Sequence, residues 1–170
     1  YGYCADRLLV GGSSAGGHLA AMLGVTNGQA EYDVGPYLEY SSAVQAVVDE
    51  FGPADLEPKK LPALNRELSA LLEDNPETAR RASPARLVSG REPPFLILHG
   101  SDDPSVPVEQ SRNFAEALHK AGCTVRYYEV PGGAHGFDTP ESYALLTNFV
   151  LEQLPAGPCS EGYVRSCPKS

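Results

Sequence analysis

The feature that most constrains this chain is a Gly-x-Ser-x-Gly pentapeptide at residues 12–16, between two segments of different periodicity. The apolar run Arg7–Val10 precedes it and predicts a buried strand, whereas the segment Ala15–Leu23 that follows predicts a helix. A strand that turns into a helix this abruptly bends at the central serine, and we expect glycines to be required two residues to either side, here Gly12 and Gly16. The pentapeptide therefore predicts a nucleophile elbow within an α/β fold.

The elbow also predicts what the serine can do. The hydroxyl of Ser14 would stand at the carboxyl end of a parallel strand, exposed to a ligand. The N–H of Ala15, at the helix N-terminus, would be free to face a developing oxyanion. A lone Gly-x-Ser-x-Gly is weak evidence, and a buried turn serine in a glycine-rich loop is the alternative for Ser14.

Strand-like and helix-like segments alternate along the chain, which predicts a parallel sheet with helices on both faces. The predicted strands are Arg7–Val10, Val44–Phe51, Phe95–Leu98 and Thr124–Val130. The predicted helices are Ala15–Leu23, Leu61–Leu72, Val108–Ala121 and Pro140–Leu154. Thr124–Val130 carries charges and suits an edge of the sheet, whereas Arg7–Val10 has the character of a central strand.

Two further loops carry the chemistry that a serine nucleophile needs. A serine hydroxyl requires a base, usually a histidine that a carboxylate orients, in the chain order Ser, acid, His. Asp102 and Asp103 follow the strand Phe95–Leu98, and His135 follows Thr124–Val130. Because carboxyl ends of parallel strands lie at one edge of a sheet, these loops would converge on the elbow. The sequence thus predicts a serine hydrolase.

Taken together, the motifs resemble the α/β-hydrolase esterases related to hormone-sensitive lipase, in particular the branch with acetylxylan and feruloyl esterases. The resemblance extends over nearly all of residues 6–154. It rests on segments 11–20, 44–48, 51–55, 82–84, 93–100 with Asp103 and Val106-Pro107, and 131–136.

The resemblance assigns roles to individual residues. It implies that Ser14 is the nucleophile, Asp103 the acid and His135 the base, with no metal and no organic cofactor. Asp103 is preferred to Asp102 because the family places its acid three residues after the glycine of His-Gly and just before the Val-Pro turn. The substrate implied is a small ester, with an acylated carbohydrate as one such class.

The family also takes oxyanion donors from a His-Gly-Gly loop upstream of the elbow, and this chain has no such loop. We therefore expect the chain to be the C-terminal part of a longer protein, containing strands five to eight of the fold. Residues 1–154 would form this partial domain, residues 57–92 an insert over the active-site rim, and residues 155–170 a loose tail. The uncovered edge of Arg7–Val10 would then favour self-association, and the isolated chain would be weakly active.

Composition excludes some classes of partner. The net charge of −9 argues against nucleic acid and anionic membrane surfaces as partners, and no apolar run reaches the roughly 18 residues of a membrane span.

The four cysteines show no Cys-x-x-Cys spacing and no histidine at zinc-site spacing, which argues against a metal site. The sequence is compatible with a disulfide between Cys159 and Cys167, and equally with free thiols. Targeting is not predictable from this sequence.

Three functions remain to be weighed. The leading prediction is a carboxylic ester hydrolase that works through an acyl-enzyme. An amide hydrolase with the same triad, similar to arylformamidases or prolyl-oligopeptidase-like peptidases, is the first alternative, although such peptidases usually carry a large aromatic residue where this chain has Ala15. A non-catalytic, hydrolase-like binding module is the second. His18, His99, His119 and Asp55 are expected to serve structural roles.

Overall fold

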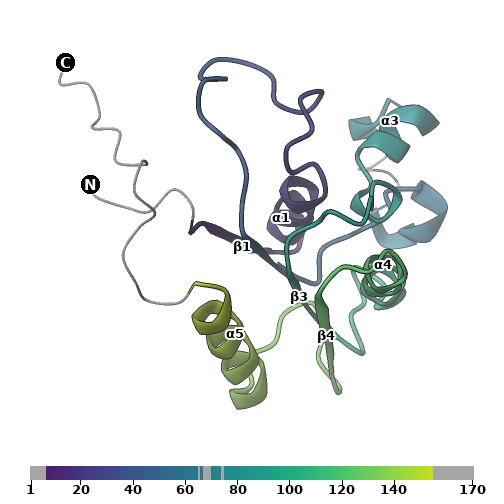
Figure 1. The fold of residues 1–170 in the computed structure, drawn as a ribbon. Coiled ribbons are helices and arrows are strands. Elements are labelled where there is room, and N and C mark those ends of the chain that lie inside the picture. Colours follow the sequence, from purple (N-terminus) through teal and green to yellow (C-terminus); the bar gives the residue numbers. More distant parts are fainter. Residues whose placement is uncertain (1–6, 65, 67–69, 74, 155–170) are drawn as a thin grey trace, which may run out of the picture.

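The computed structural model describes residues 7–64, 66, 70–73 and 75–154, and its centre is a four-stranded parallel sheet in the order β1-β2-β3-β4 (Figure 1). The strands are β1 (Leu9–Ser13), β2 (Ala46–Glu50), β3 (Phe95–Gly100) and β4 (Val125–Val130). The longer helices are α1 (Ala15–Val25), α4 (Glu109–Lys120) and α5 (Pro140–Gln153). Between β2 and β3 lie the shorter η1 (Pro58–Lys60), η2 (Pro62–Leu64), α3 (Pro76–Arg81) and η3 (Pro84–Arg86).

Helices cover both faces of the sheet because successive strand residues point to opposite sides. On one face Val47, Phe95 and Ile97 pack with α1 and α4, where Phe114 stands edge-on to Phe95 with ring centroids 5.5 Å apart. On the other face Val48, Leu96 and Leu98 belong to the cluster that contains Phe149 of α5. The α/β class predicted from the sequence is therefore confirmed.

The predicted elements are found within a few residues of their expected bounds, with one correction. A continuous helix over 61–72 was expected, but its beginning is the 3-10 helix η2, and residues 65 and 67–69 lie outside the described part. β4 lies at a sheet edge as predicted. β1 pairs with β2, and among the described residues no strand pairs with its other side.

The residues at the helix ends explain where α5 begins and where α4 ends. Thr139 and Ser142 form a capping box at the start of α5, where Pro140 occupies the first turn. Gly122 follows α4 at φ +83°, a conformation that disfavours other residues. The capping box fixes where the chain that leaves β4 at the carboxyl edge enters α5, and Gly122 turns the chain from α4 toward the beginning of β4.

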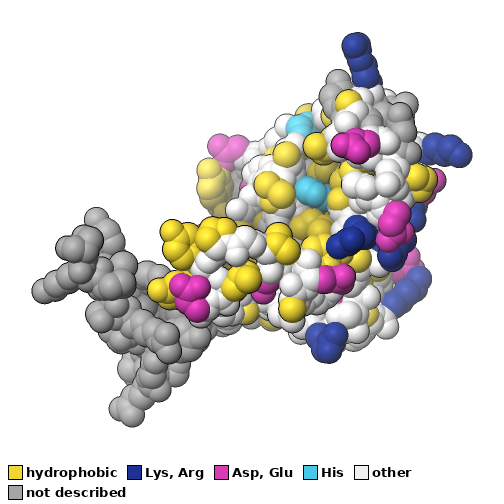
Figure 2. Space-filling view, turned by 90° about the horizontal axis from the view of Figure 1, so that it is seen from above, with side chains coloured by type: hydrophobic (Ala, Val, Ile, Leu, Met, Phe, Trp, Pro, Cys, Tyr) yellow, Lys and Arg dark blue, Asp and Glu magenta, His cyan; other side chains and the backbone are white. Residues whose placement is uncertain are grey.

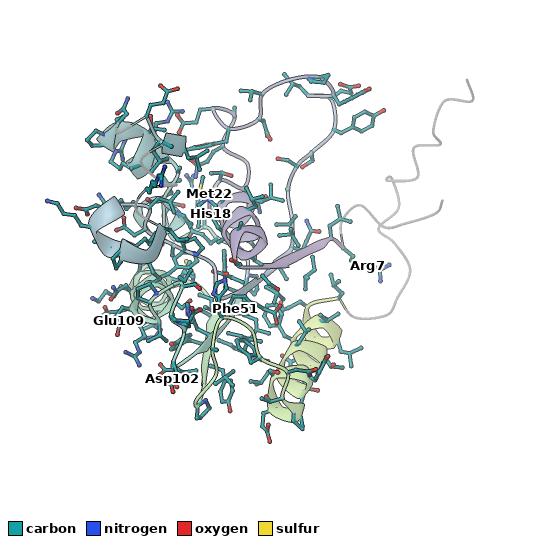
Figure 3. All side chains as sticks on the ribbon, turned by 180° about the vertical axis from the view of Figure 1, so that it is seen from behind. Arg7, His18, Met22, Phe51, Asp102 and Glu109 are labelled. Atoms are coloured by element: carbon teal, nitrogen blue, oxygen red, sulfur yellow. The ribbon has the colours of Figure 1, made fainter. Side chains whose placement is uncertain are left out.

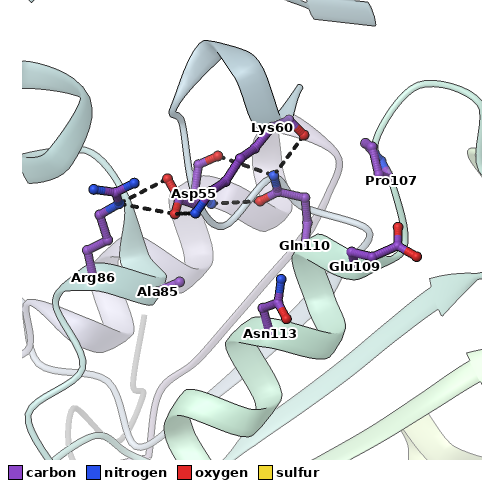
Figure 4. A pocket seen from close by; sticks show the side chains of 8 residues that line it. All are labelled: Asp55, Lys60, Ala85, Arg86, Pro107, Glu109, Gln110 and Asn113. Atoms are coloured by element: carbon purple, nitrogen blue, oxygen red, sulfur yellow. Dashed lines mark hydrogen bonds and ion pairs between the residues drawn. The ribbon is translucent and has the colours of Figure 1, made fainter. Parts of the chain in front are cut away.

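The segment between β2 and β3 is tied to the sheet's carboxyl edge by a polar network around Asp55 (Figure 4). Its carboxylate pairs with Lys60 at 2.7 Å and with Arg86 at 3.0 Å, and the buried amide of Gln110 bonds the backbone of Ala54 and Asp55. The network borders a cavity of about 530 Å³ lined by Asp55, Lys60, Ala85, Arg86, Pro107, Glu109, Gln110 and Asn113. Asp55 thus has a structural role, as expected.

In the part of the chain that the structure describes, no helix combines the length and the apolar character needed to cross a bilayer.

Candidate active site

The site lies at the carboxyl edge of the sheet, where backbone hydrogen bonds continue the strand pairing past the strand ends. Ser14 N–H donates to Glu50 O at 2.9 Å, and Phe51 N–H donates to Leu98 O at 2.8 Å. Ser101 N–H then donates to Val130 O at 3.0 Å. The residues that follow each strand are therefore fixed relative to the next one.

Ser14 sits on the sharp turn that the pentapeptide predicts, at φ 55° and ψ −120°. A non-glycine residue at positive φ is strained, and such strain concentrates at functional sites. A Cβ on Gly12 would come within 2.5 Å of the Gly16 backbone, so Gly12 is required for the turn. Ala15 begins α1, where an N–H has no acceptor within the helix.

The sequence predicts that Gly16 must be a glycine, but in the structure the position that has no room for a side chain is Gly17. A Cβ on Gly16 would have no heavy atom within 4 Å. A Cβ on Gly17 would clash with Asp49 Oδ1 and lie 3.0 Å from the carbonyl oxygens of Glu50 and Gly12. The close approach of α1 to β2 explains the difference, and it could not be inferred from the pentapeptide.

His135 connects the elbow to the acid loop. Its Nε2 lies 2.8 Å from Ser14 Oγ, and its Nδ1 lies 2.7 Å from Asp103 Oδ2. An ionised carboxylate only accepts, so Nδ1–H donates to Asp103 and Nε2 is left to accept the Ser14 hydroxyl. The His135 side chain keeps 25% of its surface exposed, whereas the Asp103 side chain has none.

Asp103, and not Asp102, is the carboxylate against His135. Its Oδ1 accepts the N–H groups of Ser105 and Val106 at 2.8 and 2.9 Å. Burial alone would raise the pKa of Asp103, but these N–H groups and His135 outweigh it and hold that pKa below its usual value. Asp102 is exposed, and its carboxylate accepts the Ser101 hydroxyl at 2.8 Å.

His99 supports the acid loop, which agrees with the structural role expected of it. Its Nε2 lies 2.9 Å from Val106 O and 3.2 Å from Asp103 Oδ2, and its Nδ1 lies 2.7 Å from Ser111 Oγ. Burial lowers the pKa of His99 and favours the neutral ring. His99 therefore fixes Asp103 without adding a second charge.

Phe51 was not identified from the sequence, although it contacts His135. It has φ 46°, is almost fully buried, and its ring lies edge-on to the His135 ring with centroids 4.9 Å apart. The ring of Phe137 in turn packs edge-on against the Phe51 ring, with centroids 5.3 Å apart. In Figure 3, Phe51 lies between His18 on α1 and the loop with Asp102. No signal in the sequence marks an aromatic side chain after a strand as a neighbour of a distant histidine.

The remaining polar groups have structural surroundings. His18 is half-buried, with Nδ1 2.9 Å from Pro53 O, and His119 is exposed on α4. Cys123 is a free thiol, and the other three cysteines lie outside the described residues. Within the described ranges, no group of three or more His, Cys, Asp and Glu side chains is placed to hold a metal ion.

The face of the molecule shown in Figure 2 carries histidine side chains among hydrophobic and uncharged ones, with basic side chains gathered to one side. The BD-FAE family model matches residues 1–118. The chain belongs to the BD-FAE family. The predicted likeness to α/β-hydrolase esterases is thereby confirmed.

Individual esterases are similar to this chain in sequence and in structure. Esterase LipC of Mycobacterium tuberculosis is 39% identical over 140 residues, which cover 77% of this chain and 35% of LipC. The truncated form of a carbohydrate esterase from gut microbiota has a TM-score of 0.76 at 34% identity, covering 87% of this chain and 60% of that one. Esterase 2 of Thermogutta terrifontis phosphonylated by sarin has a TM-score of 0.71 at 26% identity, covering 88% and 58%. The chain spans about a third of the length of LipC.

The two neighbouring glycines of α1 give a first prediction. Gly16→Ala should stabilise the protein by up to about 1 kcal/mol, because alanine has the higher helix propensity and open space surrounds the new methyl group. Gly17→Ala should destabilise it by about 1–3 kcal/mol, because the methyl group overlaps Asp49. Urea unfolding of both variants measures the difference, and effects of the same sign would show that α1 does not approach β2 this closely.

Proposed function

We propose that the protein is a carboxylic ester hydrolase with Ser14 as nucleophile, His135 as general base and Asp103 as the carboxylate that orients it. The observation that carries this proposal is the position of the His135 ring, which is within hydrogen-bond distance of both Ser14 Oγ and Asp103 Oδ2. Three loops from three strands supply these groups, which disfavours a chance arrangement of common residues.

In the proposed reaction Ser14 Oγ attacks the ester carbonyl carbon while its proton passes to His135 Nε2. The carbonyl oxygen becomes an oxyanion that the Ala15 N–H stabilises. The intermediate collapses, and the alcohol leaves with the proton from His135, so that the acyl group stays on Ser14. Water then attacks the acyl-enzyme, again giving its proton to His135, and the second collapse releases the acid and restores Ser14.

The names of the similar proteins support an ester substrate. LipC is called an esterase, and the gut-microbiota protein a carbohydrate esterase, so acylated carbohydrates are the first class of substrate to test. The phosphonylated Thermogutta esterase supports organophosphorus reagents as probes of the serine.

The alternatives make different predictions. An amide hydrolase would cleave an acyl anilide at a rate comparable to the matching nitrophenyl ester, whereas an esterase should strongly prefer the ester. A non-catalytic module would react with neither. The paired hydrogen bonds of His135 favour catalysis, since ligand binding alone does not require that a base be held against a hydroxyl.

Ser14→Ala should abolish hydrolysis of a short-chain nitrophenyl ester by the full-length protein while leaving its fold intact. Loss of the nucleophile typically lowers kcat by several powers of ten, on the order of 10⁶. Steady-state kinetics with circular dichroism as a folding control would measure this. A variant that keeps most of the kcat would show that the nucleophile lies elsewhere.

Asp103→Asn should be far more damaging than Asp102→Asn. An amide at position 103 cannot hold His135 in the required tautomer, and such a change can cost about 10⁴ in kcat. Asp102→Asn is the matched control, since that side chain is exposed and does not contact His135. Equal rates for both variants, or a loss confined to Asp102→Asn, would contradict the assignment.

A further inference from the structure

Asp49 is a carboxyl group buried directly beneath the elbow. It lies on β2 opposite Gly12 of β1, one residue before the Glu50 carbonyl that accepts Ser14 N–H. Its side chain is 0% exposed. One oxygen, Oδ1, accepts Gly52 N–H at 2.9 Å, while Oδ2 has no hydrogen-bond partner in the described part of the chain.

The backbone around Asp49 is shaped to fit this carboxyl group. Two glycines press on Oδ1, because a Cβ on Gly17 would overlap it and a Cβ on Gly52 would lie 2.5 Å from it. Asp49 Oδ2 is buried without a hydrogen-bond partner in the described part of the chain, and Oδ1 accepts a single N–H group. A carboxyl group that is fully buried with so few donors is destabilised when it bears a negative charge, which favours the protonated form.

Charged groups on the surrounding elements do not compensate such a charge. Glu50 on the same strand adds a negative charge, and the residues opposite Asp49 on β1 and β3 are Gly12 and Ile97. Burial lowers the pKa of both His18 on α1 and His99 on β3, which favours their neutral forms. Gln110 and Ser111, the buried polar residues of α4, are uncharged.

We propose that Asp49 is a positioning residue that works as the neutral acid: it fixes the first turn of α1 against β2, and its proton keeps negative charge away from the oxyanion site at Ala15. This inference rests on the proposed function for its catalytic consequence. Burial raises the pKa of Asp49 to about 7, in agreement with a proton held by geometry. The site should therefore lose efficiency as pH rises through neutrality, in addition to any change caused by His135.

Asp49→Asn tests the proposal, because the amide has the same shape and no ionisable proton. A raised folded pKa means that wild-type stability falls as pH rises from the unfolded value of 3.8 to about 7 and is then constant. The Tm of Asp49→Asn minus that of wild type should thus increase with pH over this window. Asp33→Asn, at an exposed aspartate, is the matched control and should give a constant difference.

The second readout is the rate at which a fluorophosphonate probe labels the full-length protein. The ratio of labelling rates, Asp49→Asn over wild type, should rise about tenfold between about pH 6 and pH 8, as wild-type Asp49 ionises. If the Tm difference between Asp49→Asn and wild type changes with pH but the probe labels neither protein, the proposed function is overturned. The protonated state of buried Asp49 would still be supported by that result. A constant Tm difference would overturn the inference itself.

A measurement on the unsubstituted protein covers the case in which Asp49→Asn does not fold. The side-chain ¹³C resonance of Asp49 should titrate with a midpoint near 7, whereas exposed aspartates titrate near 4. A midpoint near 4 for Asp49 would contradict the proposal independently of any variant.

Discussion

The site depends on one structural constraint, the parallel hydrogen-bond ladder that continues beyond the ends of the strands. The first residue after each of β1, β2 and β3 donates its backbone N–H to the neighbouring strand: Ser14 to Glu50, Phe51 to Leu98, and Ser101 to Val130. These bonds fix the separations of the loops by backbone geometry. The side-chain distances between Ser14, His135 and Asp103 depend on that spacing, together with the contacts that hold each side chain, such as the bonds of Asp103 to Ser105 N–H and Val106 N–H.

The loops are also held to one another by close backbone contact. A Cβ on Gly100 would overlap the Gly133 carbonyl, and Asp102 N–H donates to that same oxygen at 2.8 Å. Ser101 Oγ accepts Gly132 N–H at 2.8 Å. The acid and base loops therefore form one unit, which explains why a short histidine loop can present an ordered ring.

Two residues with strained backbone lie where this unit meets the elbow. Ser14 and Phe51 are both non-glycine residues at positive φ, and each immediately follows the end of a strand. Conformations of this kind cost about 1–3 kcal/mol and persist only when their surroundings enforce them. Here the ladder enforces both, since the N–H of each residue is bonded to the adjacent strand end.

Much of this arrangement was predictable, because it follows from order along the chain. The alternation of strands and helices predicts the parallel sheet, and the parallel sheet brings Ser14, Asp103 and His135 to one edge. The supports of the site were not predictable, because Gly17, Phe51 and Asp49 act through contacts between segments distant in sequence. Gly16 was singled out by the pentapeptide alone, whereas the packing of α1 on β2 makes Gly17 the restricted position. The ion pairs of Asp55 with Lys60 and Arg86 were not predicted either, because they too depend on how the folded chain brings these residues together.

The central claim is that the geometry at this edge activates one particular serine. The most direct test is peptide mass spectrometry of the protein after reaction with a fluorophosphonate, with His135→Ala as the control. Ser14 should carry the phosphonyl group in the unsubstituted protein, and labelling should be lost in the control, because only a serine with a base at 2.8 Å reacts readily. A phosphonyl group on another residue, or equal labelling of Ser14 without His135, would contradict the account.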